Sequence, residues 1–198
     1  MRVVQRHTPD DKYLALGITV GADQDGEPQE MRFHDIWTWG EVRLLEVAEL
    51  QSHPSLAAMG PEPLSDSFTG ETLRTSLSRR PKTAVKAALL DQEVLAGVGN
   101  IYADESLFRA GILPQRKSAT LTVDEAESLA REIRTVLGEA IGDGGTVSDN
   151  FFDTAGSPGK YQPQVYDRGG QPCIKCGTTL DRTRIGGRGT VYCANCQK

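Results

Sequence analysis

Long apolar runs are missing from this 198-residue sequence. No stretch approaches the roughly 18 apolar residues that a membrane-spanning helix needs, so we expect no membrane association. The first residues also lack the apolar segment of a signal peptide, which favours a cytoplasmic protein. Hydrophobic residues make up 38% of the chain and charged residues 25%. This composition is that of a globular protein able to build a core.

Histidine and cysteine are both scarce. The three histidines, His7, His34 and His53, show no spacing typical of metal ligands, and we interpret them as ordinary surface or core residues. The four cysteines all lie near the C-terminal end of the sequence. Any metal chemistry or disulfide pairing must therefore be sought there.

The cysteines form two Cys-x-x-Cys pairs. Cys173 and Cys176 make the first pair, and Cys193 and Cys196 make the second after 16 intervening residues. This spacing is typical of a structural zinc site, because each pair places two thiolates on one side of the ion and the two pairs complete a tetrahedron. The alternatives are a redox dithiol or two disulfides. Both are disfavoured in a cytoplasmic chain that has no other cysteine.

Charge is distributed unevenly along the chain. The formal net charge is −5, yet residues 157–198 carry seven basic and two acidic side chains. Binding depends on the local field at the contact surface, so this basic segment is more informative than the acidic average. Between the cysteine pairs, Arg182, Arg184 and Arg188 flank a glycine-rich turn, and arginine offers forked donors to phosphate. By itself the ribbon predicts a nucleic-acid or protein partner.

The sequence predicts four segments. Residues 1–50 are expected to form a partial β-sandwich domain, because short runs with partial alternation are separated by turns. The expected strands cover residues 2–6, 13–20, 31–33 and 41–46. Residues 51–81 contain four prolines and predict a linker. Residues 82–163 are expected to be mainly helical, and residues 164–198 form the cysteine module.

Helical periodicity is clearest over residues 122–141. Thr122 and Glu125 have the spacing of a capping box, and an apolar stripe follows as far as Ile141, with Gly142 ending the helix. A shorter helix is expected over residues 101–110, with its buried side at Ile101, Leu107, Phe108 and Ala110. The segment 142–164 has no periodicity and predicts a long loop.

A glycine turn leads into the shorter helix. Gly97 and Gly99 precede Asn100, where the helix is expected to begin. Such a turn exposes backbone N–H groups at a helix N-terminus, which suits a phosphate. Two interpretations stay open here: an anion site, or an asparagine that simply caps the helix. The turn lacks the third glycine and the βαβ context of a dinucleotide-binding fingerprint.

Taken together, these motifs resemble the formamidopyrimidine-DNA glycosylase and endonuclease VIII family of base-excision repair proteins. The resemblance covers roughly two thirds of the chain with high specificity, and its stretches are residues 59–64, 82–86, 97–103, 105–112, 164–166 and 173–196. It implies an α+β multidomain fold: a partial β-sandwich, then a helix–two-turn–helix domain with a C-terminal zinc ribbon. It also implies double-stranded DNA, damaged or abasic, as the partner of a monomeric, nucleoid-associated protein.

The resemblance assigns DNA contacts to three residues. Asn100 corresponds to the asparagine at the turn of the helix–two-turn–helix motif, and Arg188 to the arginine at the tip of the zinc ribbon. Lys12, in the stretch Asp-Lys-Tyr-Leu, resembles a phosphate-contacting lysine of the family. Such backbone contacts position a duplex without reading its sequence. The plainer alternatives are a helix cap, a solvated arginine and a strand-edge lysine.

The chain departs from the family at its start. The family uses a proline amine directly after the initiator, with an adjacent glutamate, whereas this sequence begins Met1-Arg2-Val3. We therefore expect no catalytic residue in the chain as given. Two hypotheses follow: an enzyme with glycosylase and AP-lyase activity whose true start lies upstream, or a short paralogue that binds damaged or bent DNA without cleaving it.

A second departure concerns the residues that fill the gap left by an everted base. Trp37, Thr38 and Trp39 stand where the family usually has an arginine and a phenylalanine, and Ile18 replaces a methionine. Trp39 is a candidate apolar wedge between bases. The alternative is that both tryptophans are core residues.

Overall fold

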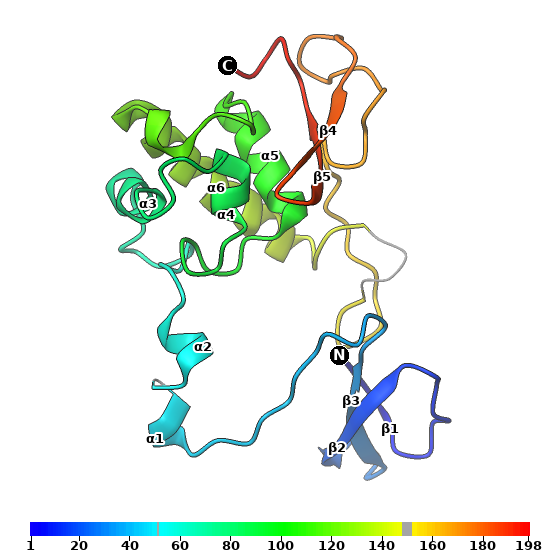
Figure 1. The fold of residues 1–198 in the computed structure, drawn as a ribbon. Helices are drawn as coiled ribbons and strands as arrows, with labels where there is room; N and C mark the ends of the chain where they lie inside the picture. Colours follow the sequence, from blue (N-terminus) through cyan, green and yellow to red (C-terminus); the bar gives the residue numbers. More distant parts are fainter. Residues whose placement is uncertain (51, 148–151) are drawn as a thin grey trace. The chain divides into compact units, whose positions relative to one another are not determined.

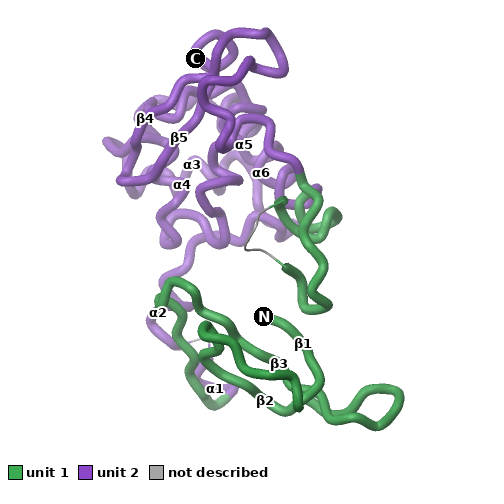
Figure 2. Tube along the Cα trace, turned by 90° about the vertical axis from the view of Figure 1, so that its right-hand side faces the viewer, with its two compact units in different colours: residues 1–46, 140–161 green, residues 47–139, 162–198 purple. Residues whose placement is uncertain are grey.

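The structure, a computed structural model, describes residues 1–50, 52–147 and 152–198. The chain divides into two compact units, residues 1–46 with 140–161 and residues 47–139 with 162–198 (Figures 1 and 2). The first unit contains a three-stranded sheet and the second a two-stranded sheet. Among the described residues, no helix has the length and apolar character needed to cross a bilayer.

The sheet of the first unit is antiparallel, with strand order β1–β3–β2. Its strands are β1 (Arg2–Gln5), β2 (Leu14–Ala22) and β3 (Pro28–His34). In the turn between β2 and β3, the Asp23 carboxylate accepts the backbone N–H groups of Asp25 and Glu27 at 3.0 and 2.8 Å. These strands occupy the places that sequence alternation predicts, and β3 begins three residues earlier than expected.

Residues 41–46 do not form the predicted strand. Leu44 is fully exposed and Val42 is 59% exposed. A strand needs a neighbour to accept its ladder of hydrogen bonds. The three strands of this unit pair among themselves and leave no described strand against residues 41–46.

The second unit is largely helical. Its helices are α1 (Val47–Leu50), α2 (Pro54–Ala57), α3 (Gly70–Leu77), α4 (Val85–Leu89), α5 (Asn100–Ala110), the 3₁₀ turn η1 (Ser118–Thr120) and α6 (Val123–Gly142). The core contains fully buried leucines from four of these helices: Leu73, Leu77, Leu89, Leu107 and Leu129. Helix α3 lies inside the segment predicted to be a linker. Its apolar residues are four apart, Thr69 caps it, and the prolines of the segment fall outside it.

Helix α6 follows the sequence prediction closely. The Thr122 hydroxyl accepts the Glu125 N–H at 3.2 Å and the Glu125 carboxylate accepts the Thr122 N–H at 2.8 Å, which confirms the capping box. The apolar stripe is buried from Ala126 to Val136, but Ile141 is 64% exposed. The stripe therefore stops contributing to the core in the last turn of the helix.

The C-terminal segment forms a hairpin, β4 (Asp181–Ile185) and β5 (Arg188–Tyr192). Gly186 and Gly187 make its two-residue turn with φ values of 57° and 77°, the left-handed region that such a hairpin turn requires. A Cβ atom at Gly186 would lie 3.1 Å from Cβ of Ala87 in α4, so the turn approaches this helix closely. The predicted ribbon with a glycine turn is confirmed.

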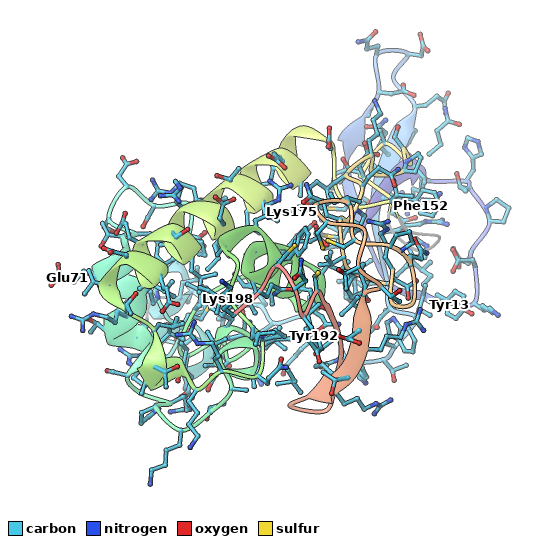
Figure 3. All side chains as sticks on the ribbon, turned by 90° about the horizontal axis from the view of Figure 1, so that it is seen from above. Tyr13, Glu71, Phe152, Lys175, Tyr192 and Lys198 are labelled. Carbon is cyan, nitrogen blue, oxygen red and sulfur yellow. The ribbon has the colours of Figure 1, made fainter. Side chains whose placement is uncertain are left out.

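The ribbon packs on helix α5. Phe108 of α5 is buried together with Val165, Leu180 and Val191. Lys175 Nζ lies 4.4 Å from the centre of the Phe108 ring. Figure 3 shows Lys175, Tyr192 and Lys198 of the C-terminal segment beside the helices of this unit.

Truncating the core should test this packing. Leu129 is 0% exposed, and we expect Leu129→Ala to lower the free energy of unfolding by about 2–5 kcal/mol, because the truncation leaves a cavity. Val123 on the same helix is 65% exposed, so Val123→Ala should change it by about 0.5 kcal/mol or less. Urea unfolding of both variants measures the difference. Equal losses would contradict the assignment of Leu129 to the core.

Candidate zinc site and nucleic-acid interface

The four cysteine sulfurs converge at one point. All four Sγ atoms lie within 4.8 Å of one another, with Cys173 and Cys196 at 3.9 Å and Cys176 and Cys193 at 3.5 Å. A zinc tetrahedron with Zn–S bonds of about 2.3 Å has edges of about 3.8 Å. A disulfide needs sulfurs about 2.05 Å apart, so these distances exclude two disulfides. The donor set and its spacing fit a zinc ion.

The pKa values of the thiols also favour a bound cation. Hydrogen bonds, first from Thr178 and then from Asn195, lower the pKa of Cys176 to about 5. The hydrogen bond with the Cys176 side chain, and then burial, raise the pKa of Cys196 to about 12. Several thiolates this close together repel one another unless a cation lies between them. A bound divalent ion removes that repulsion and stabilises the ribbon.

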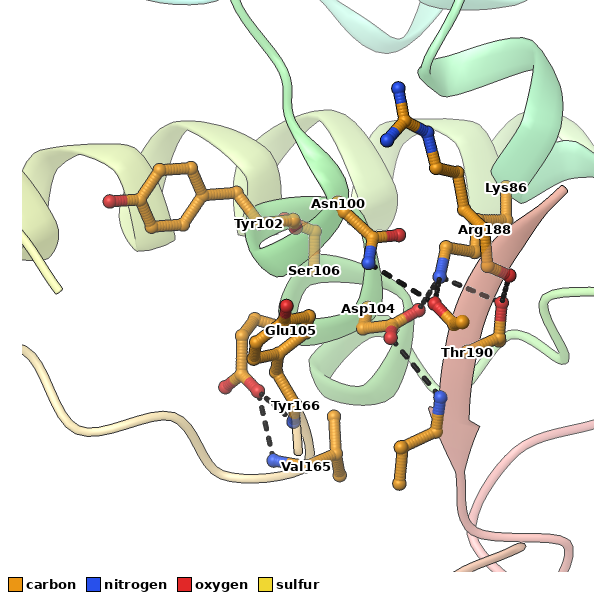
Figure 4. Close-up of polar contacts among 12 residues, drawn as sticks. Lys86, Asn100, Tyr102, Asp104, Glu105, Ser106, Val165, Tyr166, Arg188 and Thr190 are labelled. Atoms are coloured by element: carbon orange, nitrogen blue, oxygen red, sulfur yellow. Dashed lines mark hydrogen bonds and ion pairs between the residues drawn. The ribbon is translucent and has the colours of Figure 1, made fainter. Parts of the chain in front are cut away.

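Asn100 and Arg188 lie on the same cleft. Its lining also includes Gln92, Gly99 and Gly186, so the glycine turn before α5 and the hairpin tip face a common space. Figure 4 shows Asn100 beside α5 and Arg188 extending from β5. A second hollow shares Asn100 and is lined by Arg182 and Arg184 of β4. The structure thus brings together two of the three residues predicted to contact DNA.

The cap interpretation of Asn100 is wrong. Gly99 is the N-cap of α5, with extended backbone, and Asn100 is the first helical residue. The Asn100 side chain instead crosses to the hairpin, where its Nδ2 donates to the carbonyl of Gly189 at 3.1 Å. Asn100 Oδ1 is buried without a hydrogen-bond partner among the described residues. This side chain therefore serves the interface between helix and hairpin.

Below the cleft lies a buried ion pair that sequence reasoning missed. Lys86 of α4 is 0% exposed and Asp104 of α5 is 1% exposed, and Lys86 Nζ lies 2.7 Å from Asp104 Oδ1. Burial lowers the pKa of Lys86 and raises that of Asp104 to about 6, since each charge has left water. The available signal was a lysine inside the apolar face formed by Val85, Ala88 and Leu89.

Glu105, the next residue of α5, holds the chain that enters the ribbon. Its carboxylate, 0% exposed, accepts backbone N–H groups from Gln164, Val165 and Tyr166 at 2.7, 2.8 and 2.9 Å. Figure 4 shows the contacts with Val165 and Tyr166. The predicted buried side of α5 holds for Leu107 and Phe108, whereas Ile101 and Ala110 are only half-buried. Acidic residues take part of the expected apolar face, because they bind the ribbon rather than the core.

Lys12 belongs to the first unit. It lies in the turn between β1 and β2, outside both strands, with its Nζ 4.6 Å from the centre of the Tyr13 ring. Buried Arg32 steadies this turn by donating to the carbonyls of Thr8 and Pro9 at 2.6 and 2.9 Å. Lys12 is exposed and available to an anion.

The two tryptophans are not core residues. Trp37 and Trp39 are 66% and 75% exposed, and their rings stack with centroids 5.8 Å apart. The Asp35 carboxylate accepts the N–H groups of Trp37 and Gly40 at 3.1 and 2.6 Å, which holds the turn that carries them. Thr38 between them adopts a φ of 56°, a strained value for a β-branched residue.

Comparison with known proteins agrees with this geometry. The formamidopyrimidine-DNA glycosylase H2TH domain family matches residues 59–151, and the zinc finger found in FPG and IleRS matches residues 170–198. A formamidopyrimidine-DNA glycosylase from Desulfitobacterium hafniense is 48% identical over 170 residues, which is 85% of this chain and 62% of the relative. One from Salmonella agona is 40% identical over 200 residues, covering 100% of this chain and 71% of the relative.

A solved structure is also similar to this chain. The Lactococcus lactis FPG variant in complex with DNA that contains Fapy-dG has a TM-score of 0.87 and 30% identity, over 100% of this chain and 70% of that chain. The chain spans less than two thirds of the length of the first relatives it matches. The fold is an α+β arrangement with a helix–two-turn–helix domain and a zinc finger, and the chain belongs to the formamidopyrimidine-DNA glycosylase family. Its four cysteines form the structural zinc site of that finger.

Removing the metal should unfold the ribbon. A chelator, or Cys196→Ser, removes the attraction that holds four thiolates together, so we expect residues 164–198 to lose their ordered signals in NMR spectra. Zinc content falls from one ion per chain to none. A ribbon that keeps its amide dispersion without metal would contradict a structural role for zinc.

The buried carboxylate should affect the pH dependence of stability. Because the pKa of Asp104 is about 6 in the folded chain and about 3.9 when unfolded, the folded state binds more protons between these values. This group's contribution to the free energy of unfolding therefore falls as pH rises through that window. Between pH 4 and pH 7, the free energy of unfolding of the wild type should fall by on the order of 1–3 kcal/mol more than that of Asp104→Asn, with both proteins saturated with zinc. Urea unfolding at several pH values measures this, and a constant difference would contradict it.

Proposed function

We propose that this chain binds damaged or abasic double-stranded DNA and acts in base-excision repair. In the family this process removes oxidised bases and then cleaves the strand at the abasic site. The proposal is supported by membership of the family and by the DNA that accompanies the matched Lactococcus lactis structure. The observation that carries it is the cleft in which Asn100 and Arg188 lie together.

The arginines of this cleft and of the neighbouring hollow suit a phosphodiester backbone. Among the described residues, Arg182, Arg184 and Arg188 form no ion pair with an acidic side chain, so their charge is available to a ligand. The hairpin that carries them is held by the zinc site and by α5, which lowers the entropy lost on binding. Asn100 and Arg188 then hold neighbouring phosphates of one strand, and Lys12 provides a further phosphate contact.

Phosphate contacts prepare a duplex for base flipping. Binding of the phosphates on both sides of a damaged base pair favours a bent duplex. In a bent duplex the damaged base leaves the stack at a lower cost in free energy. We assign the wedge that enters the resulting gap to Trp39. Its exposure and its stacking on Trp37 support this role, because exposed aromatic rings stack on any base.

The same proposal extends to organisation and location. Residues 1–50 act as a partial sandwich domain, 82–163 as the helix–two-turn–helix domain and 164–198 as the zinc finger. The segment 51–81, predicted to be a linker, also contributes α3 and its core leucines to the helical domain. We propose a monomer that works in the cytoplasm on nucleoid DNA. Size-exclusion chromatography with light scattering measures the oligomeric state directly.

Two substitutions test the cleft. Asn100→Ala and Arg188→Ala should each weaken binding to an abasic duplex by roughly 1–3 kcal/mol, through loss of a charged or buried hydrogen bond. The effect should be similar for unrelated sequences, and Arg188→Ala should lower the slope of log K against log salt by about one. Fluorescence anisotropy at several salt concentrations measures both quantities.

The matched control is Arg131→Ala. Arg131 lies on α6, is 62% exposed and lines neither hollow that contains Asn100. We expect its affinity for DNA to stay within about twofold of wild type. Unchanged affinity in both cleft variants, or an equal loss in the control, would overturn the assignment.

A further inference from the structure

Lys86 lies in the core, where its ammonium group has a counter-charge and hydrogen-bond partners. Its ammonium group is completely buried, and it donates to the carbonyl of Gly189 and to the hydroxyl of Thr190, both at 2.7 Å. Asp104 supplies the counter-charge, with its Oδ1 2.7 Å from Lys86 Nζ. Both hydrogen-bond acceptors belong to β5, the strand that begins with Arg188.

Asp104 extends this contact to the next residue of the strand. Its second oxygen accepts the backbone N–H of Val191 at 3.1 Å. Lys86 and Asp104 thus bind three successive residues of β5, namely Gly189, Thr190 and Val191. Figure 4 shows the ion pair lying between helix α5 and this strand. Because a buried charge without its partner is costly, the pair tolerates little displacement of the strand.

The contacts of Lys86 reach both residues that are proposed to bind phosphate. The Thr190 hydroxyl donates to the carbonyl of Arg188 at 3.2 Å, so the backbone of the arginine is tied to the lysine through one side chain. The carbonyl of Gly189 accepts from Asn100 as well as from Lys86. The buried ammonium group of Lys86 therefore connects Arg188 at the hairpin tip with Asn100 at the start of α5.

We propose that Lys86 and Asp104 are positioning residues, which hold Arg188 in register with Asn100 so that both reach phosphates of the same DNA strand. This inference rests on the proposed function. Neither residue touches DNA, because both side chains lie beneath the surface. Their effect on affinity is transmitted through Thr190 and Gly189 to the hairpin tip.

The test replaces the pair with apolar side chains of similar size. Lys86→Met combined with Asp104→Leu removes both charges together, a change that buried ion pairs often tolerate without loss of stability. The cobalt-substituted protein reports on the cysteine site through its absorption bands, and these should be unchanged. We expect this double variant to bind an abasic duplex about tenfold more weakly than wild type, with backbone motion at Arg188 increased in NMR relaxation of the free protein.

Thr190 supplies a milder variant. Thr190→Val keeps the shape and removes the hydroxyl that links Lys86 to Arg188, so it should weaken DNA binding about threefold or more. Thr190→Ser retains the hydroxyl and should restore binding to within about twofold of wild type. This pair of variants keeps the inference testable even if the double variant at Lys86 and Asp104 does not fold.

Two controls separate positioning from general stability. Arg116→Met breaks a partly exposed ion pair with Glu125 away from the cleft, and it should leave DNA affinity within about twofold of wild type. In an Arg188→Ala background, the Lys86 and Asp104 substitutions should have almost no further effect, since they act through the arginine. A full tenfold loss in that background would overturn the inference, as would unchanged affinity of the double variant and of Thr190→Val.

The proposed function and this inference fail in different ways. If the wild-type chain shows no salt-dependent binding to DNA, the proposed function is wrong, whatever the variants do. The relaxation measurement needs no DNA. A hairpin tip that stays as rigid without Lys86 and Asp104 as with them overturns the positioning role, even if the wild type binds.

Discussion

A buried positive charge needs a counter-charge and hydrogen-bond acceptors, and this constraint shapes the interface between helix and ribbon. Lys86 meets it with one carboxylate and two groups of β5. The strand that supplies these acceptors therefore has a defined place against α4 and α5. Because β5 has this place, Asn100 and Arg188 line the same cleft.

Zinc contributes a second, complementary restraint. The four thiolates fold the ribbon back on itself and align β4 with β5, but they do not determine where the hairpin lies on the helices. That position depends on contacts to α5: the apolar contact at Phe108, the carboxylate of Glu105 on the entering chain and the ion pair below the cleft. Metal binding and docking together give a rigid surface that presents arginines.

The two units differ in how they present side chains for DNA. In the helical unit, Arg188 extends from a hairpin whose neighbours are buried and hydrogen-bonded. In the unit that contains the three-stranded sheet, Lys12 and the stacked tryptophans lie on turns, held by Arg32 and by Asp35 respectively. Turns carry binding groups well when a hydrogen-bonded side chain anchors them, because the anchor limits the conformations open to the loop.

Local patterns in the sequence determined much of this protein. The cysteine spacing predicted the zinc site, the Thr122 and Glu125 pair predicted the start of α6, and paired glycines predicted the hairpin turn, because each signal depends only on residues close together in the chain. Tertiary structure decided the rest. Lys86, Asp104 and Thr190 look like ordinary polar residues in sequence, and they become a buried network only when strands and helices far apart in the chain meet. The lack of a strand over residues 41–46 and the contact of the Asn100 side chain with Gly189 were likewise decided by which neighbours the fold provides, and a local pattern contains no information about them.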